Sequence, residues 1–278
     1  MAKVEQITEP EELAKEEHEA EQAKEKAEAP EPKPKKSKQQ PAYIDCKQKV
    51  LMDAVSVMDG LLHEVILNID ENGLTATEMD QANIAMYVLD LKPGVFNEIE
   101  GKAKVRVQVK ALKGMLKRAK PDDNVRITFS NPIELVFASK FNKTFILPQI
   151  DIEVDKVQKL PTMEHTAIFK IKTELLIEAV DDSGEVADSL TFGVKNNKLS
   201  ISAKGDMSGY SGEVATIEGV EGIACQSKYA REYMTKIVKK ISPEVTVKLA
   251  SDYPIILEYD LGNESKLTLL LAPRVETD

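Results

Sequence analysis

The chain has 278 residues, of which 42% are hydrophobic, and its formal net charge is −10. This length suits two domains, and an acidic chain binds nucleic acid only where Lys and Arg are locally concentrated. Two distant cysteines make no disulfide framework, no apolar run reaches the roughly 18 residues of a membrane-spanning helix, and the N-terminus lacks the apolar core of a secretory signal. We therefore expect a soluble protein of a reducing intracellular compartment, with no membrane association.

Residues 1–40 differ from the rest of the chain. The segment 11–29 is rich in Glu, Lys and Ala but has almost no apolar stripe, and 30–36 alternates proline with charged residues. This composition predicts a disordered, charged tail. A docking arm for a partner remains the alternative.

The ordered pattern begins near residue 41. Apolar residues at helical spacing predict a helix over 47–62, and the turn sequence Asp70–Gly73 predicts a hairpin. A second helix is expected over 110–120, before Pro121. The strands expected around them are 42–46, 64–69, 73–78, 84–91, 105–109, 125–129, 134–139 and 143–147.

The next part of the chain follows the same plan. Helices are expected over 173–181 and 228–241. The expected strands are 167–171, 190–194, 198–203, 211–217, 245–250, 255–259 and 267–272. Residues 149–164 carry no convincing helical stripe and are predicted to be a linker.

These two parts are copies of one unit. Asp53-Ala54-Val55 recurs 125 residues later as Glu178-Ala179-Val180, and 132–137 recurs at an offset of 122 as 254–259. A repeat of this size is a whole domain, because solenoid repeats run roughly 20–50 residues. We predict an α+β fold of two similar domains, each with antiparallel sheets and two helices. The predicted boundaries are tail 1–40, domain one 41–148, connector 149–164 and domain two 165–278.

Positive charge is concentrated on the second predicted helix of each copy. An ordinary solvated face mixes Glu with Lys, and it remains the alternative reading. With no base-reading motif in the chain, a basic face predicts sequence-independent contact with the DNA backbone. The predicted DNA-facing residues are Lys49, Lys110, Lys113, Lys117, Lys120, Lys228, Arg231, Lys236, Lys239 and Lys240. The first helices support this reading less well, since 173–181 is acidic.

No catalytic constellation stands out. The chain has three histidines, and the sequence Gly209-Tyr210-Ser211-Gly212 is one residue short of a hydrolase elbow. Asp181-Asp182 beside Ser183-Gly184 is typical of a turn, and there is no phosphate loop. We therefore predict no enzyme activity, no cofactor and no metal site.

Three segments resemble one known family. Asn72-Gly73-Leu74 with 79–86 is similar to its strand-and-loop signature, Asp252–Tyr259 resembles its "D.PL..EY" segment, and 271–276 resembles its "LAP(K/R)(I/V)E" terminus. Together they resemble sliding clamps of the proliferating cell nuclear antigen (PCNA) type, in an archaeal-like form. The resemblance covers about residues 42–276.

The resemblance implies a ring of three subunits around duplex DNA. Such a clamp is a processivity factor that binds DNA polymerase, the clamp loader, flap endonuclease and ligase through their PIP-box motifs. Carried over by position, the partner pocket would use Met79, Ile84, Met86, Ile150, Pro254, Ala272 and Pro273. By the same carry-over, the subunit edges would be 142–147 and 206–214. Asn83 stands where the family often has His, and the N-terminal tail has no counterpart.

Alternatives from other classes remain open. The acidic helix 173–181 departs from the family pattern and suits a specialised subunit of a heterotrimer, and a checkpoint-type clamp or a non-ring protein-binding adaptor would also carry such motifs. Sequence does not separate a homotrimer from a heterotrimer. The expected location is the cytoplasm with the nucleoid, or the nucleus of a eukaryote.

Overall fold

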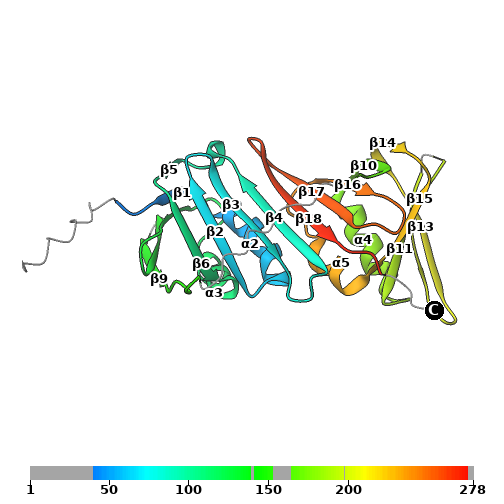
Figure 1. Ribbon diagram of the computed structural model, residues 1–278, viewed down its shortest axis with the longest axis horizontal. Coiled ribbons are helices and arrows are strands. Elements are labelled where there is room, and N and C mark those ends of the chain that lie inside the picture. The colour runs from blue at the N-terminus through cyan, green and yellow to red at the C-terminus, as the bar shows by residue number, and fades with distance from the viewer. Residues whose placement is uncertain (1–39, 139–140, 153–163, 197, 275–278) are drawn as a thin grey trace, which may run out of the picture. The chain divides into compact units, whose positions relative to one another are not determined.

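The computed structural model describes residues 40–138, 141–152, 164–196 and 198–274 (Figure 1). Residues 40–278 form one compact unit. The predicted tail, apart from Gln40, and residues 153–163 of the predicted connector lie outside the described residues.

Two successions of strands and helices follow each other along the chain. The first comprises β1 (Tyr43–Lys47), α2 (Gln48–Leu61), β2 (Glu64–Asp70), β3 (Gly73–Met79), β4 (Ala85–Leu91), the 3-10 turn η1 (Pro93–Val95), β5 (Glu98–Glu100), β6 (Ala103–Gln108), α3 (Val109–Leu116), β7 (Asn124–Thr128), β8 (Ile133–Ala138) and β9 (Lys143–Leu147). The second comprises β10 (Ala167–Lys172), α4 (Thr173–Ser183), β11 (Ser189–Lys195), β12 (Lys198–Lys204), β13 (Gly209–Val214), β14 (Thr216–Gly222), β15 (Cys225–Ala230), α5 (Arg231–Ile237), β16 (Glu244–Leu249), β17 (Ile255–Gly262) and β18 (Ser265–Leu271). Element by element, β10 to β18 repeat β1 to β9.

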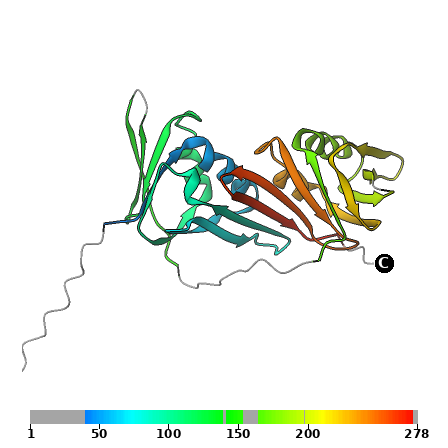
Figure 2. The same cartoon turned by 90° about the horizontal axis from the view of Figure 1, so that it is seen from above.

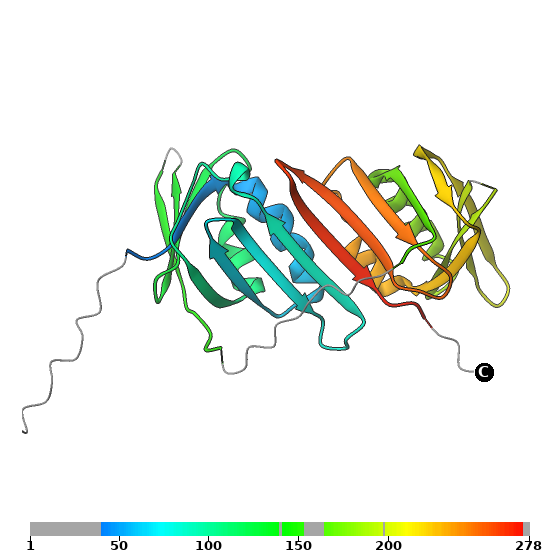
Figure 3. The same cartoon turned by 45° about the horizontal axis from the view of Figure 1, so that its top comes forward.

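The two repeats share one sheet. The sheet orders are β5-β1-β7-β8-β9, then β14-β10-β16-β17-β18-β4-β3-β2-β6, then β13-β12-β11-β15. The nine-stranded sheet therefore contains five strands of repeat two and four of repeat one. They meet where β18 pairs antiparallel with β4, from Lys266 opposite Asp90 to Leu271 opposite Ala85 (Figure 3). We call this pairing the internal seam.

All four described helices lie on one side of the sheets (Figure 2). The strands alternate accordingly: in β2, Val65, Leu67 and Ile69 are buried and their neighbours are not. Tyr87 of β4 is fully buried and its hydroxyl donates a hydrogen bond to Ala54 O of α2 at 3.1 Å. Each such buried side chain contributes roughly 1.5–3 kcal/mol, so this inner layer holds the repeats together and leaves the opposite sheet face free for function.

The first helix of each repeat follows its strand directly, with no side-chain cap. In α2, the backbone N–H groups of Gln48 and Lys49 donate to Asp123 O and Pro121 O at 2.9 and 3.1 Å. In α4, Thr173 N donates to Pro243 O at 2.9 Å. A distant turn thus satisfies N–H groups that a helix start leaves unpaired.

The predicted helix over 228–241 is wrong at both ends. Lys228 lies on β15, opposite Thr191 of β11, and α5 spans only Arg231–Ile237. Period two was hidden because the buried residues Ser227 and Tyr229 of β15 run into apolar residues at helical spacing. The repeat contains the missing signal: an offset of 122 places Arg231 opposite Val109, the first residue of α3.

Smaller differences also have a local cause. The predicted helix over 110–120 ends at Leu116, because Arg118 N and Ala119 N turn back to carbonyls three residues earlier. The predicted strand over 211–217 is two strands, β13 and β14, and the short β5 was not predicted.

Candidate partner-binding and DNA-facing surfaces

An apolar row crosses the sheet face that points away from the helices. The strand registers align Met79 of β3 with Met86 of β4, Met86 with Leu270 of β18, and Leu270 with Ile256 of β17. These four residues and Val88 pack together, separately from the main core. We call them the outer apolar row. It joins both repeats across the internal seam.

The row continues beyond this cluster. Ile256 lies opposite Lys248 of β16, which in turn lies opposite Ile168 of β10. Ile168 is 45% exposed. Sequence reasoning missed Ile256, Leu270 and Val88, although alternation along β17 and β18 assigns such residues to the outer face once the strand boundaries are known.

The predicted pocket residue Ile84 stands at one end of the row. It is 37% exposed, and its carbonyl accepts a hydrogen bond from Ala272 N at 2.9 Å. Pro254 lies just before β17, and its carbonyl is 3.3 Å from His165 Nε2. The structure therefore brings Met79, Ile84, Met86 and Ala272 to one region.

Ile150 lies elsewhere. Its backbone bridges Arg106 of β6, with Ile150 N donating to Arg106 O at 2.9 Å. Strands β2 and β3 stand between β6 and β4, which at about 4.8 Å per strand separates Ile150 from Met86 by several strand spacings. The expectation that Ile150 joins the other pocket residues is corrected.

Asp80 fixes the loop that carries Ile84. Its carboxylate accepts hydrogen bonds from the N–H groups of Ile84 and Ala85, both at 2.7 Å, and from the Tyr233 hydroxyl at 2.9 Å. Burial by itself would raise the pKa of this carboxyl, but the hydrogen bonds outweigh it and the pKa lies below its ordinary value. Burial and Asp80 together raise the pKa of Tyr233 to about 12. A residue of α5 thus holds a loop of repeat one.

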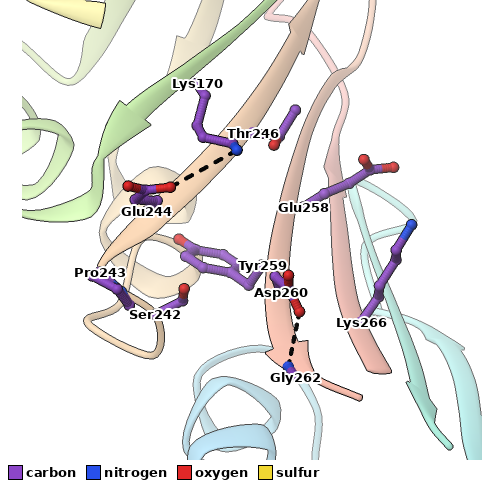
Figure 4. Close-up of a pocket in the computed structure, with 10 residues that line it drawn as sticks. All are labelled: Lys170, Ser242, Pro243, Glu244, Thr246, Glu258, Tyr259, Asp260, Gly262 and Lys266. Carbon is purple, nitrogen blue, oxygen red and sulfur yellow. Dashed lines mark hydrogen bonds and ion pairs between the residues drawn. The ribbon is translucent and has the colours of Figure 1, made fainter. Parts of the chain in front are cut away.

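A second feature of the outer face is a cavity of about 490 Å³ over β10, β16, β17 and β18 (Figure 4). Its charges are mostly matched within the protein: Lys170 Nζ is 3.8 Å from Glu244, and Glu258 pairs with Lys248 at 2.7 Å. Among the described residues, no group of three or more His, Cys, Asp or Glu side chains is placed to hold a metal ion.

Both cysteines are free and buried. Burial raises the pKa of the Cys46 thiol to about 12 and also raises the pKa of Cys225. Thiols with a raised pKa hold little thiolate at neutral pH, so they are poor nucleophiles.

On the helix side, exposed basic residues gather on α3 and the turn after it. Val109, Leu112 and Leu116 of α3 are buried, so the helix presents its other side outward. Within the described ranges, the exposed residues Lys110, Lys117 and Lys120 form no ion pair. Arg118, which was not predicted, is exposed beside them.

Other predicted DNA-facing residues are paired with carboxylates of the same chain. Lys113 lies 2.8 Å from Asp59 and Lys236 lies 2.6 Å from Glu232. Lys49 pairs with Asp53, and Lys240 pairs with Glu174, whose pKa it lowers by a hydrogen bond. Pairing reduces the positive field that these four lysines offer to a phosphate.

The remaining members of that set lie in three different environments. Lys228 alternates with buried Ser227 and Tyr229 on β15, so it points away from the helices and is not on their face. The half-buried Arg231 approaches Gly184 at the end of α4, where a cation is favourable. Lys239 lies beyond α5 and donates to Thr235 O at 2.7 Å.

Helix α4 has the opposite charge. Its exposed acidic residues are Glu174, Glu178, Asp181 and Asp182. The helix side is therefore basic in repeat one and partly acidic in repeat two.

Comparison with known proteins places the chain. The family model for the N-terminal domain of proliferating cell nuclear antigen matches residues 46–159. A DNA polymerase sliding clamp of Pyrococcus horikoshii is 31% identical over 239 residues, covering 82% of this chain and 96% of the relative. This chain belongs to the DNA polymerase sliding clamp family. The family resemblance found in the sequence is confirmed.

Solved clamps have the same fold. PCNA of Thermococcus kodakaraensis superposes with a TM-score of 0.79 at 20% identity, over 84% of this chain and all of the other. PCNA of A. fulgidus, in a structure with the C-terminal region of FEN-1 bound, superposes with a TM-score of 0.77 at 21% identity, over 85% of this chain and all of the other. The predicted α+β clamp fold of antiparallel sheets is confirmed.

Two edge strands of this clamp correspond to the internal seam. By repeat equivalence, β9 corresponds to β18 and β13 to β4, yet β9 pairs only with β8 and β13 only with β12 in the described part of the chain. Ile146 on β9 is 53% exposed, and Phe141 just before it is 72% exposed. None of the helices in the described ranges combines the length and apolarity that crossing a bilayer requires.

Proposed function

We propose that this chain is a DNA sliding clamp whose subunits close into a ring of three around duplex DNA and tether polymerase and other replication and repair proteins. One observation carries the proposal: the strands equivalent to the paired β18 and β4 are the unpaired β9 and β13. Pairing β9 of one copy with β13 of the next repeats the internal seam between subunits. An unpaired edge strand needs such a partner.

The seam also gives a register for the subunit contact. In the seam, Leu269 lies opposite Tyr87 and Leu270 opposite Met86. Repeat equivalence turns the first pair into Phe145 opposite Tyr210 of the neighbouring copy, and the second into Ile146 opposite Gly209. Burying the exposed Ile146 side chain then favours assembly.

The ring would hold DNA by topology and act without catalysis. The exposed lysines of α3 suit weak, sequence-independent contact with phosphates, which permits sliding. We infer that repeat one provides most of this contact, because α4 of repeat two is acidic.

Partners would dock on the outer apolar row. The PIP-box motifs of DNA polymerase, the clamp loader, flap endonuclease and ligase carry apolar side chains, and the row with Ile84 offers a matching surface. The adaptable side chains of Met79 and Met86 suit several partners. Tethering then raises the effective concentration of each enzyme at the DNA.

Native mass spectrometry of the chain at micromolar concentration tests the ring. We expect three times the chain mass of 30.8 kDa, and a monomer for Ile146→Lys, because a charge on an edge strand opposes pairing. Ile168→Lys, exposed on β10 away from both edges, is the matched control and stays trimeric. A stable monomer that assembles neither with itself nor with a related clamp chain contradicts the proposal.

The acidity of α4 favours a second candidate, a specialised or checkpoint-type subunit of a heterotrimeric clamp. Such a chain would be monomeric alone and would form the ring only with related chains whose helices are more basic. Failure to stimulate polymerase or to bind PIP-box peptides would favour the checkpoint type. A non-ring adaptor predicts that charge on the helix side is irrelevant to retention on DNA.

A further inference from the structure

A cavity of about 790 Å³ opens on the outer face of the four-stranded sheet, where β11, β12 and β15 meet the segment after β18. Its charged lining residues are Lys204, Lys228, Arg274 and Asp252. Three cations face one carboxylate, an excess of two positive charges in a chain of net charge −10. Hydroxyl groups, among them those of Ser189 and Thr191, complete a lining rich in hydrogen-bond donors.

The backbone fixes where these cations stand. Lys204 ends β12, and Arg274 N donates to Lys228 O at 2.7 Å, which anchors the chain after β18 against β15. In the described part of the chain, Lys204 and Arg274 form no ion pair. Their charge remains available to a ligand.

The other outer-face cavity differs in this respect. In the cavity of Figure 4, Lys170 and Glu244 lie within ion-pair distance, and Glu258 is matched by Lys248. An excess of cations is therefore a property of one cavity and not of the whole outer face.

The basic cavity continues from the outer apolar row. Leu270 belongs to the row, Ala272 N bonds the carbonyl of Ile84, and both Pro273 and Arg274 line the cavity. Four residues separate Leu270 from Arg274, a span of at most about 14 Å. One extended peptide of about ten residues reaches both places.

We propose that this cavity binds an acidic segment that flanks the apolar docking motif of a partner protein. Carboxylates of such a segment accept hydrogen bonds from the Lys204 ammonium and the Arg274 guanidinium, the latter in a bidentate geometry. The inference rests on the proposed function, since it assumes a partner peptide on the outer apolar row. It adds the chemistry by which this clamp selects among partners.

Fluorescence anisotropy with the full-length chain tests the assignment. The probes are the C-terminal FEN-1 peptide of A. fulgidus extended at either end by four Glu or by four Gln. At low ionic strength we expect the Glu extension, at one end only, to bind about fivefold more tightly than the Gln extension, because exposed ion pairs each add a small factor. Added salt should abolish this gain.

Matched variants locate the effect. Lys204→Glu and Arg274→Glu should lose the gain and bind the Gln peptide as before. Lys195→Glu makes the same change of charge on the same sheet, at the far end of β11, and should keep the gain.

Equal binding of Glu and Gln peptides overturns the inference and leaves the proposed function standing. A loss of the gain in Lys195→Glu overturns it too, since the effect would then be one of net charge. A gain that appears only after residues 1–39 are removed would assign the cavity to the chain's own acidic N-terminal segment. Binding of neither peptide would overturn both proposals.

Discussion

Asp80 is the residue whose surroundings connect the two repeats most directly. It is 7% exposed, takes three backbone N–H groups of its own loop, and receives the Tyr233 hydroxyl from α5. Hydrogen bonds to a charged group each contribute about 1.5–3 kcal/mol, and neutral ones about half of that. The charge of Asp80 is therefore important for both the loop of Ile84 and the contact between repeats.

Asp80→Asn should lower the free energy of unfolding at pH 7 by about 2 kcal/mol, because neutral hydrogen bonds replace charged ones. The folded-state pKa of Asp80 is depressed, so its contribution is complete above the unfolded value of about 3.9 and is lost as pH falls through the folded pKa. Urea unfolding at pH 7, 5 and 3 should show the gap between the two proteins narrowing below pH 4. Asp206→Asn, in an exposed loop, is the control. A gap independent of pH would contradict the role of the charge.

Met86 contributes at the partner surface. Met86→Ala with Pro254→Ala should weaken binding of the FEN-1 peptide about tenfold, since truncation removes apolar contact area. Native mass spectrometry should still give the ring, because both positions lie away from β9 and β13. Met115→Ala on α3 makes the same substitution on the opposite side and should leave peptide affinity unchanged. Unaltered affinity in the double variant would remove both residues from the site.

At the scale of elements, the second helices of the repeats are not equivalent. Helix α3 and its following turn carry exposed lysines without carboxylate partners in the described chain, whereas α5 is short and its Lys236 is paired. The DNA contact of this clamp thus depends on α3 more than on α5.

Reversing Lys110, Lys117 and Lys120 to Glu should shorten the lifetime of a loaded clamp on circular duplex DNA about tenfold at low salt, because each lost phosphate contact weakens a salt-dependent interaction. The matched control reverses Lys102, Lys195 and Lys266, which changes net charge equally away from the helices. Lifetimes that fall equally in both variants would assign the effect to net charge. An unchanged lifetime in the α3 variant would support a non-ring adaptor.

At the scale of the whole molecule, the seam makes two copies of a domain into one unit. Beyond the strand pairing, Lys92 N donates to Ser265 Oγ at 2.8 Å and Asn263 Nδ2 donates to Gly94 O at 2.7 Å. Helices α2 and α5 also meet where Gly60 approaches Lys236. Neither repeat has an independent edge at the seam.

The monomeric Ile146→Lys variant should therefore unfold in one cooperative transition in urea. Far-UV circular dichroism and tyrosine fluorescence, the chain having no tryptophan, should give coincident curves, because coincidence of different probes marks two-state unfolding. Two separated transitions would show that the seam does not couple the repeats.

The sequence by itself determined the repeat, the first helix of each copy and most strands. Those features depend on local periodicity and on turn residues such as Asn72-Gly73, and both are read over a few neighbours. It also identified Met79, Ile84 and Met86 through a family resemblance. Confusion arose only where two periods overlapped, at Lys228–Ile237, since a strand that runs directly into a helix offers no turn residue between them.

Only the tertiary structure decided which of these residues meet. Strand register aligned Met86 with Leu270 and Ile256, placed Ile150 beside β6, and turned Lys228 to the outer face next to Arg274. It also showed which lysines already have carboxylate partners. Sequence patterns assign a residue to a face of its own element, whereas neighbours across strands and repeats depend on long-range pairing that no local pattern encodes.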